Sequence, residues 1–221
     1  MDMGVSYVDQ SRVSGRPFYH GLKRLFDILA SSVALILLSP LFLILAIKIK
    51  GEDGGPVFYS QIRIGKDEKP FRIYKFRSMV VNAEKMKKDL LAQNEVEGAM
   101  FKMHDDPRIT KVGKFIRAHS LDELPQLWNV LIGNMSLVGP RPPLPKEVEM
   151  YSDYDKQRLL VKPGCSGLWQ ATSRNSADFA EMVQLDIEYI NKSGVFMDLW
   201  IIFKTIGVII HPNGMYEDGK K

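Results

Sequence analysis

The amino-acid sequence predicts an α+β fold that is mainly α-helical, with an N-terminal membrane helix and a small β-hairpin. Three observations support this fold class. The stretch from Ile28 to Ile47 contains no charged residue. Two short β-rich runs follow, at Val57 to Arg63 and at Phe71 to Phe76, and apolar residues recur at helical spacing in much of the remaining chain. We expect a flexible tail at 1–19, a membrane segment at 20–50, a main domain at 51–210 and a C-terminal tail at 211–221.

Composition restricts the classes of partner. The 221 residues suit one or two domains with a sizeable core. The formal net charge of +4, from 30 Lys and Arg against 26 Asp and Glu, permits an anionic partner such as nucleic acid, acidic lipid or a phosphorylated substrate. Zinc-finger, basic-zipper and RNA-motif spacings are absent from the sequence, so we expect no nucleic-acid partner. Cys165 is the only cysteine, which excludes a disulfide framework and a cysteine-based metal site.

The uncharged stretch from Ile28 to Ile47 reaches about 30 Å as a helix, the thickness of a bilayer core. Basic residues flank both ends, so the positive-inside rule places both ends in the cytoplasm. Ser39-Pro40 interrupts the stretch, because proline lacks a backbone donor and kinks a helix. We expect Ser31, Ser32 or Ser39 to satisfy backbone groups freed at this break. A helix that enters and returns to one face meets these observations, and a kinked full span is the alternative.

The two β-rich runs form a predicted hairpin, joined by the longer loop from Ile64 to Pro70. Several basic residues gather on this hairpin. Arg72 fits a solvated basic face. Lys75 and Arg77 lie on one face at the end of the second strand, so they are candidate phosphate ligands.

Two helices are predicted between the hairpin and the central motif of the chain. Ala83 to Glu95 is a polar helix, and Gly98 to Pro107 is a loop. A short amphipathic helix then begins near Ile109 and carries Arg117 close to its end. Arg117 is either a charge partner for the carboxylates that follow or a clamp for phosphate.

The central motif runs from Ser120 to Leu127 and contains two adjacent carboxylates, Asp122 and Glu123. Ser120 and Glu123 have the spacing of a capping box, which places Asp122 in the first turn of an apolar helix. Negative charge is favoured at such a helix start, so both carboxylates can be purely structural. Pro125 sits late for a first-turn proline, and we therefore expect a short or distorted start.

A proline-rich turn follows the central helix. Prolines on both sides of Arg141, in the segment from Gly139 to Pro143, fix the backbone and reduce the entropy lost when the guanidinium is held in place. This turn is either a rigid surface feature or a preorganised anion contact. Tyr151 to Leu160 is predicted to be helical, and Lys162 to Gly167 to be a turn.

The C-terminal part contains two predicted helices. The first is capped by Ser176 or Asp178 and runs to about Asn191, with Asp186 close to its apolar residues. Most such acidic residues are solvated, and a role in a site is the alternative. The segment from Val195 to Ile210 is apolar but interrupted by charges, so we expect a helix at the membrane surface, with packing into the core as the alternative.

Five motifs follow one another behind the apolar segment: Lys75-Phe76-Arg77-Ser78-Met79, Asp106-Pro107-Arg108-Ile109-Thr110, Ser120 to Leu127, Gly139-Pro140-Arg141-Pro142, and Pro163-Gly164 followed by Gly167, Trp169 and Gln170. Together they resemble the bacterial sugar transferases, also called monotopic phosphoglycosyl transferases, in their short form. The resemblance covers roughly Leu22 to Ile210. One departure is Ala171 to Arg174, where the family commonly has a glycine before the arginine.

The resemblance implies transfer of a sugar-1-phosphate from a UDP-sugar to undecaprenyl phosphate, with release of UMP, to start exopolysaccharide or capsule synthesis. Asp122 is then the nucleophile that takes the sugar phosphate covalently. Glu123 positions a metal or transfers a proton, and Mg²⁺ held by Asp122 and Glu123 neutralises crowded phosphate charge. The further expected site residues, which contact phosphate and nucleotide or support the site, are Lys75, Arg77, Arg117, Arg141, Arg174 and Asp186.

The resemblance also favours the re-entrant form of the membrane helix, with a helical catalytic domain on the cytosolic side of the bacterial inner membrane. The expected partners are UDP-sugar, undecaprenyl phosphate and membrane lipid, and a homodimer is left open. Two other functions stay open from the residues: a membrane-anchored assembly factor with structural carboxylates, and a metal-dependent phosphodiesterase that uses water. The sequence does not identify the sugar.

Overall fold

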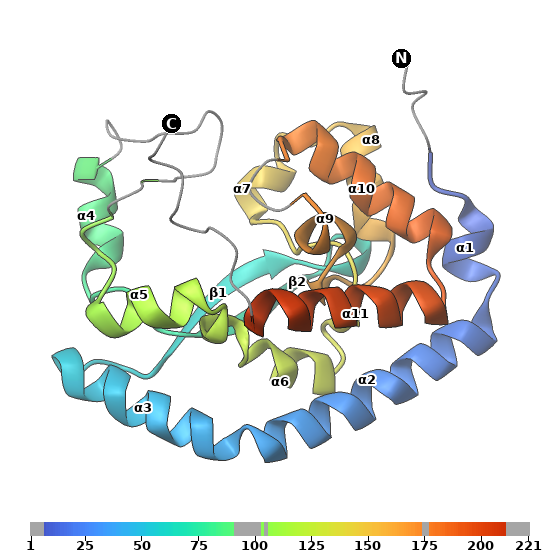
Figure 1. The fold of residues 1–221 in the computed structure, drawn as a ribbon. Coiled ribbons are helices and arrows are strands. Elements are labelled where there is room, and N and C mark those ends of the chain that lie inside the picture. Colours follow the sequence, from blue (N-terminus) through green and yellow to red (C-terminus); the bar gives the residue numbers. More distant parts are fainter. Residues whose placement is uncertain (1–6, 91–102, 104–105, 174–176, 211–221) are drawn as a thin grey trace, which may run out of the picture.

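The computed structural model describes residues 7–90, 103, 106–173 and 177–210. Two long helices, α2 (Pro17–Leu37) and α3 (Ser39–Asp53), form a bent base, and the other labelled elements lie inside this bend (Figure 1). The predicted fold class, mainly helical with a small antiparallel hairpin, is confirmed.

The elements above this base are short, apart from two helices near the C-terminus. The helices are α1 (Gln10–Ser14), α4 (Ala83–Leu90), α5 (Lys111–Ala118), α6 (Gln126–Leu131), α7 (Pro145–Val148), α8 (Asp153–Lys156), α9 (Leu168–Ala171), α10 (Phe179–Lys192) and α11 (Val195–Ile210). The 3₁₀ helices are η1 (Lys66–Glu68), η3 (Leu121–Glu123) and η4 (Gln157–Leu160). The strands are β1 (Phe58–Ile64), β2 (Pro70–Phe76), β3 (Ser136–Val138) and β4 (Gly164–Ser166).

The break between α2 and α3 falls at Leu38, next to the predicted interruption at Ser39-Pro40. Pro40 lies in the first turn of α3, where a missing N–H breaks no intrahelical bond. The Ser39 hydroxyl donates to the Ile36 carbonyl at 2.7 Å, which confirms its expected role at the break. Among the described residues, no single helix is long and apolar enough to cross a bilayer. The pair α2 and α3 meets that test together, by length and composition, but bends by 59°.

One face of the α2–α3 pair is apolar and is not covered by the described protein. Its exposed large side chains are Phe18, Leu22, Leu25, Phe26, Leu29, Val33, Ile36, Leu37, Leu43, Ile44 and Ile47. Soluble surfaces rarely carry a contiguous apolar patch of this extent. The pair therefore presents one face to the domain and another that suits an apolar environment.

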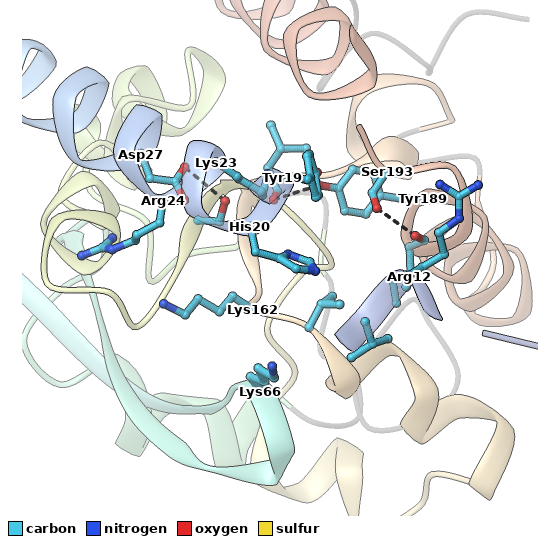
Figure 2. Close-up of a pocket in the computed structure, with 15 residues that line it drawn as sticks. Arg12, Tyr19, His20, Lys23, Arg24, Asp27, Lys66, Lys162, Tyr189 and Ser193 are labelled. Carbon is cyan, nitrogen blue, oxygen red and sulfur yellow. Dashed lines mark hydrogen bonds between the residues drawn. The ribbon is translucent and has the colours of Figure 1, made fainter. Parts of the chain in front are cut away.

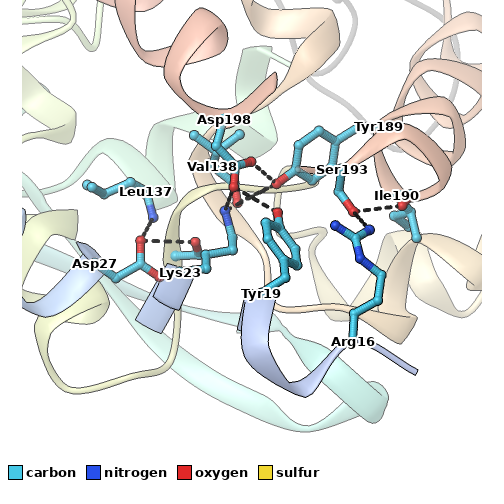
Figure 3. A network of polar contacts seen from close by, with 11 residues as sticks. Arg16, Tyr19, Lys23, Asp27, Leu137, Val138, Tyr189, Ile190, Ser193 and Asp198 are labelled. Carbon is cyan, nitrogen blue, oxygen red and sulfur yellow. Dashed lines mark hydrogen bonds and ion pairs between the residues drawn. The ribbon is translucent and has the colours of Figure 1, made fainter. Parts of the chain in front are cut away.

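The opposite face of α2 is tied to the domain by a buried polar network (Figure 3). Asp198 of α11 accepts hydrogen bonds from the hydroxyls of Tyr19 and Tyr189, each at 2.7 Å, and pairs with Lys23 at 2.9 Å. Asp27 accepts two further hydrogen bonds from β3, at 3.1 and 2.9 Å. Buried carboxylates need partners of this kind, so these contacts fix the rotation of α2 about its axis.

The predicted flexible tail at 1–19 differs from the structure over residues 7–19. Asp9 caps α1 by accepting a hydrogen bond from the Ser11 N–H at 2.9 Å. Val8 is only 7% exposed and belongs to the core between α10 and α11. The segment is polar, as a tail would be, but one cap and one buried apolar side chain order it. Helix α2 then begins at Pro17, before the predicted domain boundary.

The predicted hairpin is confirmed, with β1 and β2 antiparallel and Tyr59 opposite Lys75. The capped C-terminal helix is also confirmed: the Asp178 carboxylate accepts from the Glu181 N–H at 2.8 Å at the start of α10. The predicted helix at Ala83 to Glu95 agrees with α4, and the rest of that prediction lies outside the described residues. Ser176, the other proposed cap, lies outside them as well.

A parallel pair formed by β3 and β4 is a feature that the sequence did not predict. Each strand has three residues, too few to show a period of two. The predicted helix at Tyr151 to Leu160 is divided into α8 and η4. Helix α11 packs into the core through Ile201, which is fully buried, while Phe196 and Phe203 are 89% and 70% exposed. Its place at the membrane surface stays a prediction.

Close packing joins α3, β2 and α5 near the middle of the chain. Ile116 of α5 is buried with Ile49 of α3 and Phe76 of β2 in one hydrophobic cluster. Gly113 allows this approach, because a Cβ at that position would lie 2.0 Å from the Ser78 carbonyl oxygen. The end of α5, which leads into the carboxylate pair, is thereby held against the strand that carries the basic motif.

Candidate active site

Asp122 and Glu123 lie in the single turn η3, between α5 and α6. The predicted capping box is wrong: Ser120 has a φ of 54°, in the left-handed region, and its side chain makes no capping hydrogen bond. Glu123 turns instead toward Lys75 of β2, with 2.5 Å between Nζ and Oε1. The expected distorted start is confirmed, since α6 begins only after Pro125. The pair therefore sits on a tight turn, and non-glycine residues with positive φ often mark functional sites.

A buried amide holds Lys75 beside this turn. Asn129 of α6 has no exposed surface; its Nδ2 donates to the Arg72 carbonyl at 2.8 Å and its Oδ1 accepts from the Tyr74 N–H at 3.1 Å. Asn129 thus satisfies the edge of β2 as a neighbouring strand would. Because η3 lies directly before α6, this docking sets the distance between Lys75 and Glu123.

Arg63 of β1 connects the hairpin to the proline-rich turn. Its Nη1 donates to the Pro142 carbonyl at 3.0 Å, and the next residue donates its N–H to the Pro143 carbonyl at 2.9 Å. The turn presents Arg141, whose side chain makes no hydrogen bond or ion pair within the part of the chain that the structure describes. The charges of Arg141 and Arg63 both act on Glu123, so the turn places a guanidinium near the carboxylate pair.

The two carboxylates have different electrostatic environments. Burial and the adjacent Glu123 charge raise the pKa of Asp122 to about 6, against the opposing charges of Lys75 and Arg117. Burial also disfavours the charged form of Glu123, but the cations Lys75, Arg141 and Arg63 outweigh it and lower the pKa of Glu123. Neighbouring carboxylates with divergent pKa values are a pattern of catalytic sites. Asp122 is the more basic carboxylate of the two.

Arg117 lies at the end of α5, and its charge acts on Asp122 and on Asp106. Its Nη1 is buried and has no hydrogen-bond partner among the described residues, and the same holds for Nε of Arg63. A buried donor without a partner costs about 1–3 kcal/mol. These donors therefore suit an anionic ligand that pairs them.

Asp186 of α10 supports the proline-rich turn through Arg158. It has no exposed surface and forms an ion pair with Arg158 of η4. Arg158 also donates to the Tyr151 hydroxyl at 3.0 Å and reaches the Arg141 carbonyl at 3.5 Å. Burial raises the pKa of Asp186 to about 6, although the Arg158 charge opposes this rise. Asp186 thus positions Arg158, and Arg158 steadies the backbone that carries Arg141.

Residues 18–212 match the family profile described as bacterial sugar transferase. The chain belongs to the bacterial sugar transferase family. The match includes every residue of the site described above, the whole of α3, and all of α2 except Pro17.

Several curated proteins are similar to this chain over most of its length. The galactosyl transferase CpsE of Streptococcus agalactiae is 50% identical over 193 residues, which are 87% of this chain and 43% of that protein. The undecaprenyl-phosphate galactose phosphotransferase of Salmonella typhimurium is 47% identical over 199 residues, or 88% and 42% of the two chains. The exopolysaccharide production protein ExoY of Rhizobium meliloti is 41% identical over 214 residues, 95% of each chain. This sugar transferase therefore spans less than half of the first two relatives and nearly all of the third.

The predicted phosphate role of Arg77 requires a correction in this sugar transferase. All five of its N–H groups have acceptors: both carboxylate oxygens of Asp53 at 2.5 Å, and the carbonyls of Ile49, Pro56 and Met79. Strand β2 ends at Phe76, so Arg77 does not continue the face that carries Lys75. Arg77 clamps the end of α3 to the end of β2 and has no donor left for phosphate.

The Mg²⁺ implied by the family fits the residues at the carboxylate pair. Asp122 makes no side-chain hydrogen bond to another described residue, and Glu123 shares one oxygen with Lys75. Across the described ranges, three or more His, Cys, Asp or Glu side chains nowhere gather as a metal cage. Mg²⁺ usually keeps several waters and takes one or two carboxylates together with substrate phosphates. An open pair of carboxylates meets that requirement.

Three site residues of this sugar transferase escaped the sequence analysis. Arg63 stood among the basic residues of the hairpin, but its burial and its contact with the proline-rich turn are tertiary features. Asn129 and Arg158 are buried in the fold, but in the sequence they are only polar residues beside apolar ones, which is a weak signal of burial. Arg174, one of the predicted site residues, lies outside the described residues.

Proposed function

We propose that this sugar transferase moves a sugar-1-phosphate from a UDP-sugar to undecaprenyl phosphate and releases UMP, as the initiating step of exopolysaccharide or capsule synthesis. The observation that carries the proposal is the Lys75–Glu123 contact beside the open carboxylate of Asp122, with unpaired guanidinium donors around them. The name of the Salmonella relative, a phosphotransferase for undecaprenyl phosphate and galactose, supports the same pair of substrates.

In the first step, a carboxylate oxygen of Asp122 attacks the phosphorus atom that bears the sugar. An O–P bond forms to Asp122, the bond from this phosphorus to the bridging oxygen breaks, and UMP leaves with that oxygen. Lys75 and Arg117 offset the charge on the phosphates, because two anions must approach each other in line. The pKa of Asp122, near 6, keeps this carboxylate ionised at neutral pH and more basic than an ordinary aspartate.

In the second step, a phosphate oxygen of the acceptor attacks the phosphorus held on Asp122. The bond to the carboxylate breaks, Asp122 is restored, and the sugar is left on a diphosphate linked to the polyprenyl chain. Glu123 acts in metal positioning or in proton transfer. When bound by the carboxylate pair, Mg²⁺ would supply neutralisation of phosphate charge.

We also propose that the apolar face of α2 and α3 lies in the cytoplasmic leaflet of the bacterial inner membrane. The exposed apolar side chains and the 59° bend at Leu38 support a helix pair that enters and returns to one face. The acceptor keeps its isoprenoid tail in lipid and its phosphate at the interface. A re-entrant anchor holds the carboxylate pair at that depth, on the side where UDP-sugars are made.

The function is tested by screening UDP-sugars for UMP release with the pure protein, with and without undecaprenyl phosphate. We expect a lipid-linked sugar diphosphate as the product with wild type and none with Asp122→Asn. Free sugar phosphate as the sole product would favour a phosphodiesterase. UMP release from none of the UDP-sugars would favour an assembly factor. The same screen identifies the sugar.

The topology is tested with a cysteine at Ser6 in a Cys165→Ser background. An impermeant thiol reagent should label this cysteine only after the inner membrane is opened. Replacing Ser39 and Pro40 by alanine should straighten the helix pair and export the N-terminus, which makes the cysteine reactive from outside. Labelling from outside without those two alanine changes would establish a spanning helix instead.

A further inference from the structure

A cavity of about 320 Å³ lies away from the carboxylate pair, between the first half of α2, the hairpin turn, the segment before β4 and α10 (Figure 2). Cationic side chains dominate its charged lining, which also includes one carboxylate: Arg12, Lys23, Arg24, Lys66, Lys162 and Asp27. We call it the cationic cavity. Its volume lies in the range of small-molecule sites, about 300–1,000 Å³.

Three of these charged groups already have hydrogen-bond or ion-pair partners within the protein. Lys23 pairs with Asp198 at 2.9 Å. Arg24 donates to the last carbonyls of α6, at 2.6 and 2.8 Å. The Asp27 carboxylate accepts hydrogen bonds from β3. These contacts are structural, and they leave the cavity with an excess of positive charge.

The other three charged groups are cations without such a partner among the described residues. The side chains of Arg12, Lys66 and Lys162 make no hydrogen bond or ion pair within the ranges that the structure describes. Partial burial and the nearby charges of Arg24 and Lys66 lower the pKa of Lys162, against the opposing charge of Asp27. The imidazole of His20, which lies near the Arg12 backbone, also lines the cavity. Like charges gathered around a cavity favour an anion inside it.

The cationic cavity is separate from the carboxylate pair. Lys75, which contacts Glu123, and Pro70 are at opposite ends of β2, about 17 Å apart at about 3.3 Å per residue. Lys66 lies beyond Pro70, in the turn of the hairpin. An anion in the cavity therefore does not reach Asp122.

We propose that the cationic cavity binds a phosphate group. Two lysine ammonium groups and a guanidinium provide charge-assisted donors, which suit a phosphate better than a neutral ligand. Phe18, Leu22 and Leu25 are exposed on α2, in the same turns that line the cavity. This neighbourhood favours the head group of an anionic phospholipid as the source, with its acyl chains along α2. Free phosphate shares the same chemistry.

The test measures the thermal stability of the purified full chain in a neutral maltoside detergent, without UDP-sugar. Three compounds are titrated: dioctanoyl phosphatidylglycerol, dioctanoylglycerol, which lacks phosphate, and inorganic phosphate. The variant is Lys66→Gln with Lys162→Gln. The matched control is Lys69→Gln with Lys146→Gln, which removes the same charge from two exposed positions outside the cavity.

Phosphatidylglycerol should raise the Tm of wild type and of the control with the same half-saturation, to within about twofold. The half-saturating lipid concentration of the cavity variant should be at least about tenfold higher, as expected when two charge-assisted contacts are lost. A response to phosphatidylglycerol alone identifies lipid as the source, and a saturable response to inorganic phosphate identifies free phosphate. The proposal is overturned if dioctanoylglycerol acts as well as phosphatidylglycerol, if cavity and control variants respond alike, or if wild type responds to no phosphate compound. None of these readouts depends on sugar transfer.

Discussion

The ionised Asp122 should reduce the stability of the fold, and Asp122→Asn should therefore stabilise the protein at alkaline pH. Burial and Glu123 raise the pKa of Asp122 from 3.8 to about 6. Each tenfold change in proton affinity corresponds to about 1.4 kcal/mol, so the charged form costs up to about 3 kcal/mol in the folded state. Asp122 is only partly buried, so solvent screening reduces the observable gain to about 1–2 kcal/mol.

The sign of the pH dependence follows from the raised pKa. Below pH 3.8 both folded and unfolded Asp122 are protonated, and the carboxyl group carries no penalty. As pH rises through about 6, folded Asp122 ionises and that advantage is lost. Asparagine is neutral throughout. The gain of Asp122→Asn over wild type should therefore be small near pH 4 and complete at pH 8.

The assay is thermal unfolding in detergent with a metal chelator, so that a bound cation does not compensate Asp122. A gain of 1–2 kcal/mol corresponds to a Tm increase of about 2–8 °C for a chain of this size. Asp67→Asn, on the exposed turn of the hairpin, is the control and should change stability by less than about 0.5 kcal/mol. A lower Tm for Asp122→Asn at pH 8, or a gain that does not depend on pH, would refute the electrostatic account of this carboxylate.

Two further predictions concern the cations and the packing of the site. Lys75→Met and Arg141→Gln should each lower kcat/KM for the UDP-sugar by about 10²–10³-fold, because each removes charge that faces the reacting phosphates. Arg72→Gln, on the exposed side of the hairpin, should stay within about twofold, and equal rates for all three folded variants would remove Lys75 and Arg141 from the site. Gly113→Ala should lower stability by about 1–3 kcal/mol, because its Cβ meets a backbone oxygen at 2.0 Å. The control is Gly51→Ala, which should not lower stability, because a Cβ there would have no atom within 4 Å. If thermal unfolding shows no loss of stability for Gly113→Ala, the packing of α5 is contradicted.

Local chemistry made much of the fold predictable from the sequence. Alternating β-rich residues marked β1 and β2, Asp178 marked the start of α10, and Ser39-Pro40 marked the break between α2 and α3. Each of these signals acts over a few residues, and in each case the tertiary contacts agree with the local preference. The strands β3 and β4 have three residues each, and only their mutual contact defines them.

The site was less predictable, because tertiary contacts decide it. The capping pattern of Ser120 and Glu123 failed, since the ammonium of Lys75 draws the Glu123 carboxylate away from the backbone. Lys75 and Arg77 are two residues apart, yet the strand ends between them and Arg77 turns to Asp53. Motif spacing selected Lys75 and Arg77 alike as candidate ligands, but it did not tell a candidate phosphate ligand from a structural clamp.

The most direct test of the account is the mass of the protein after incubation with UDP-sugar alone. Without acceptor, the proposed first step should stop with one sugar phosphate bound to the chain. We expect intact-mass spectra to show that single addition, peptide mapping to place it on Asp122, and Asp122→Asn to show none. An unmodified wild type under conditions of UMP release, together with an active Asp122→Asn, would contradict the covalent mechanism.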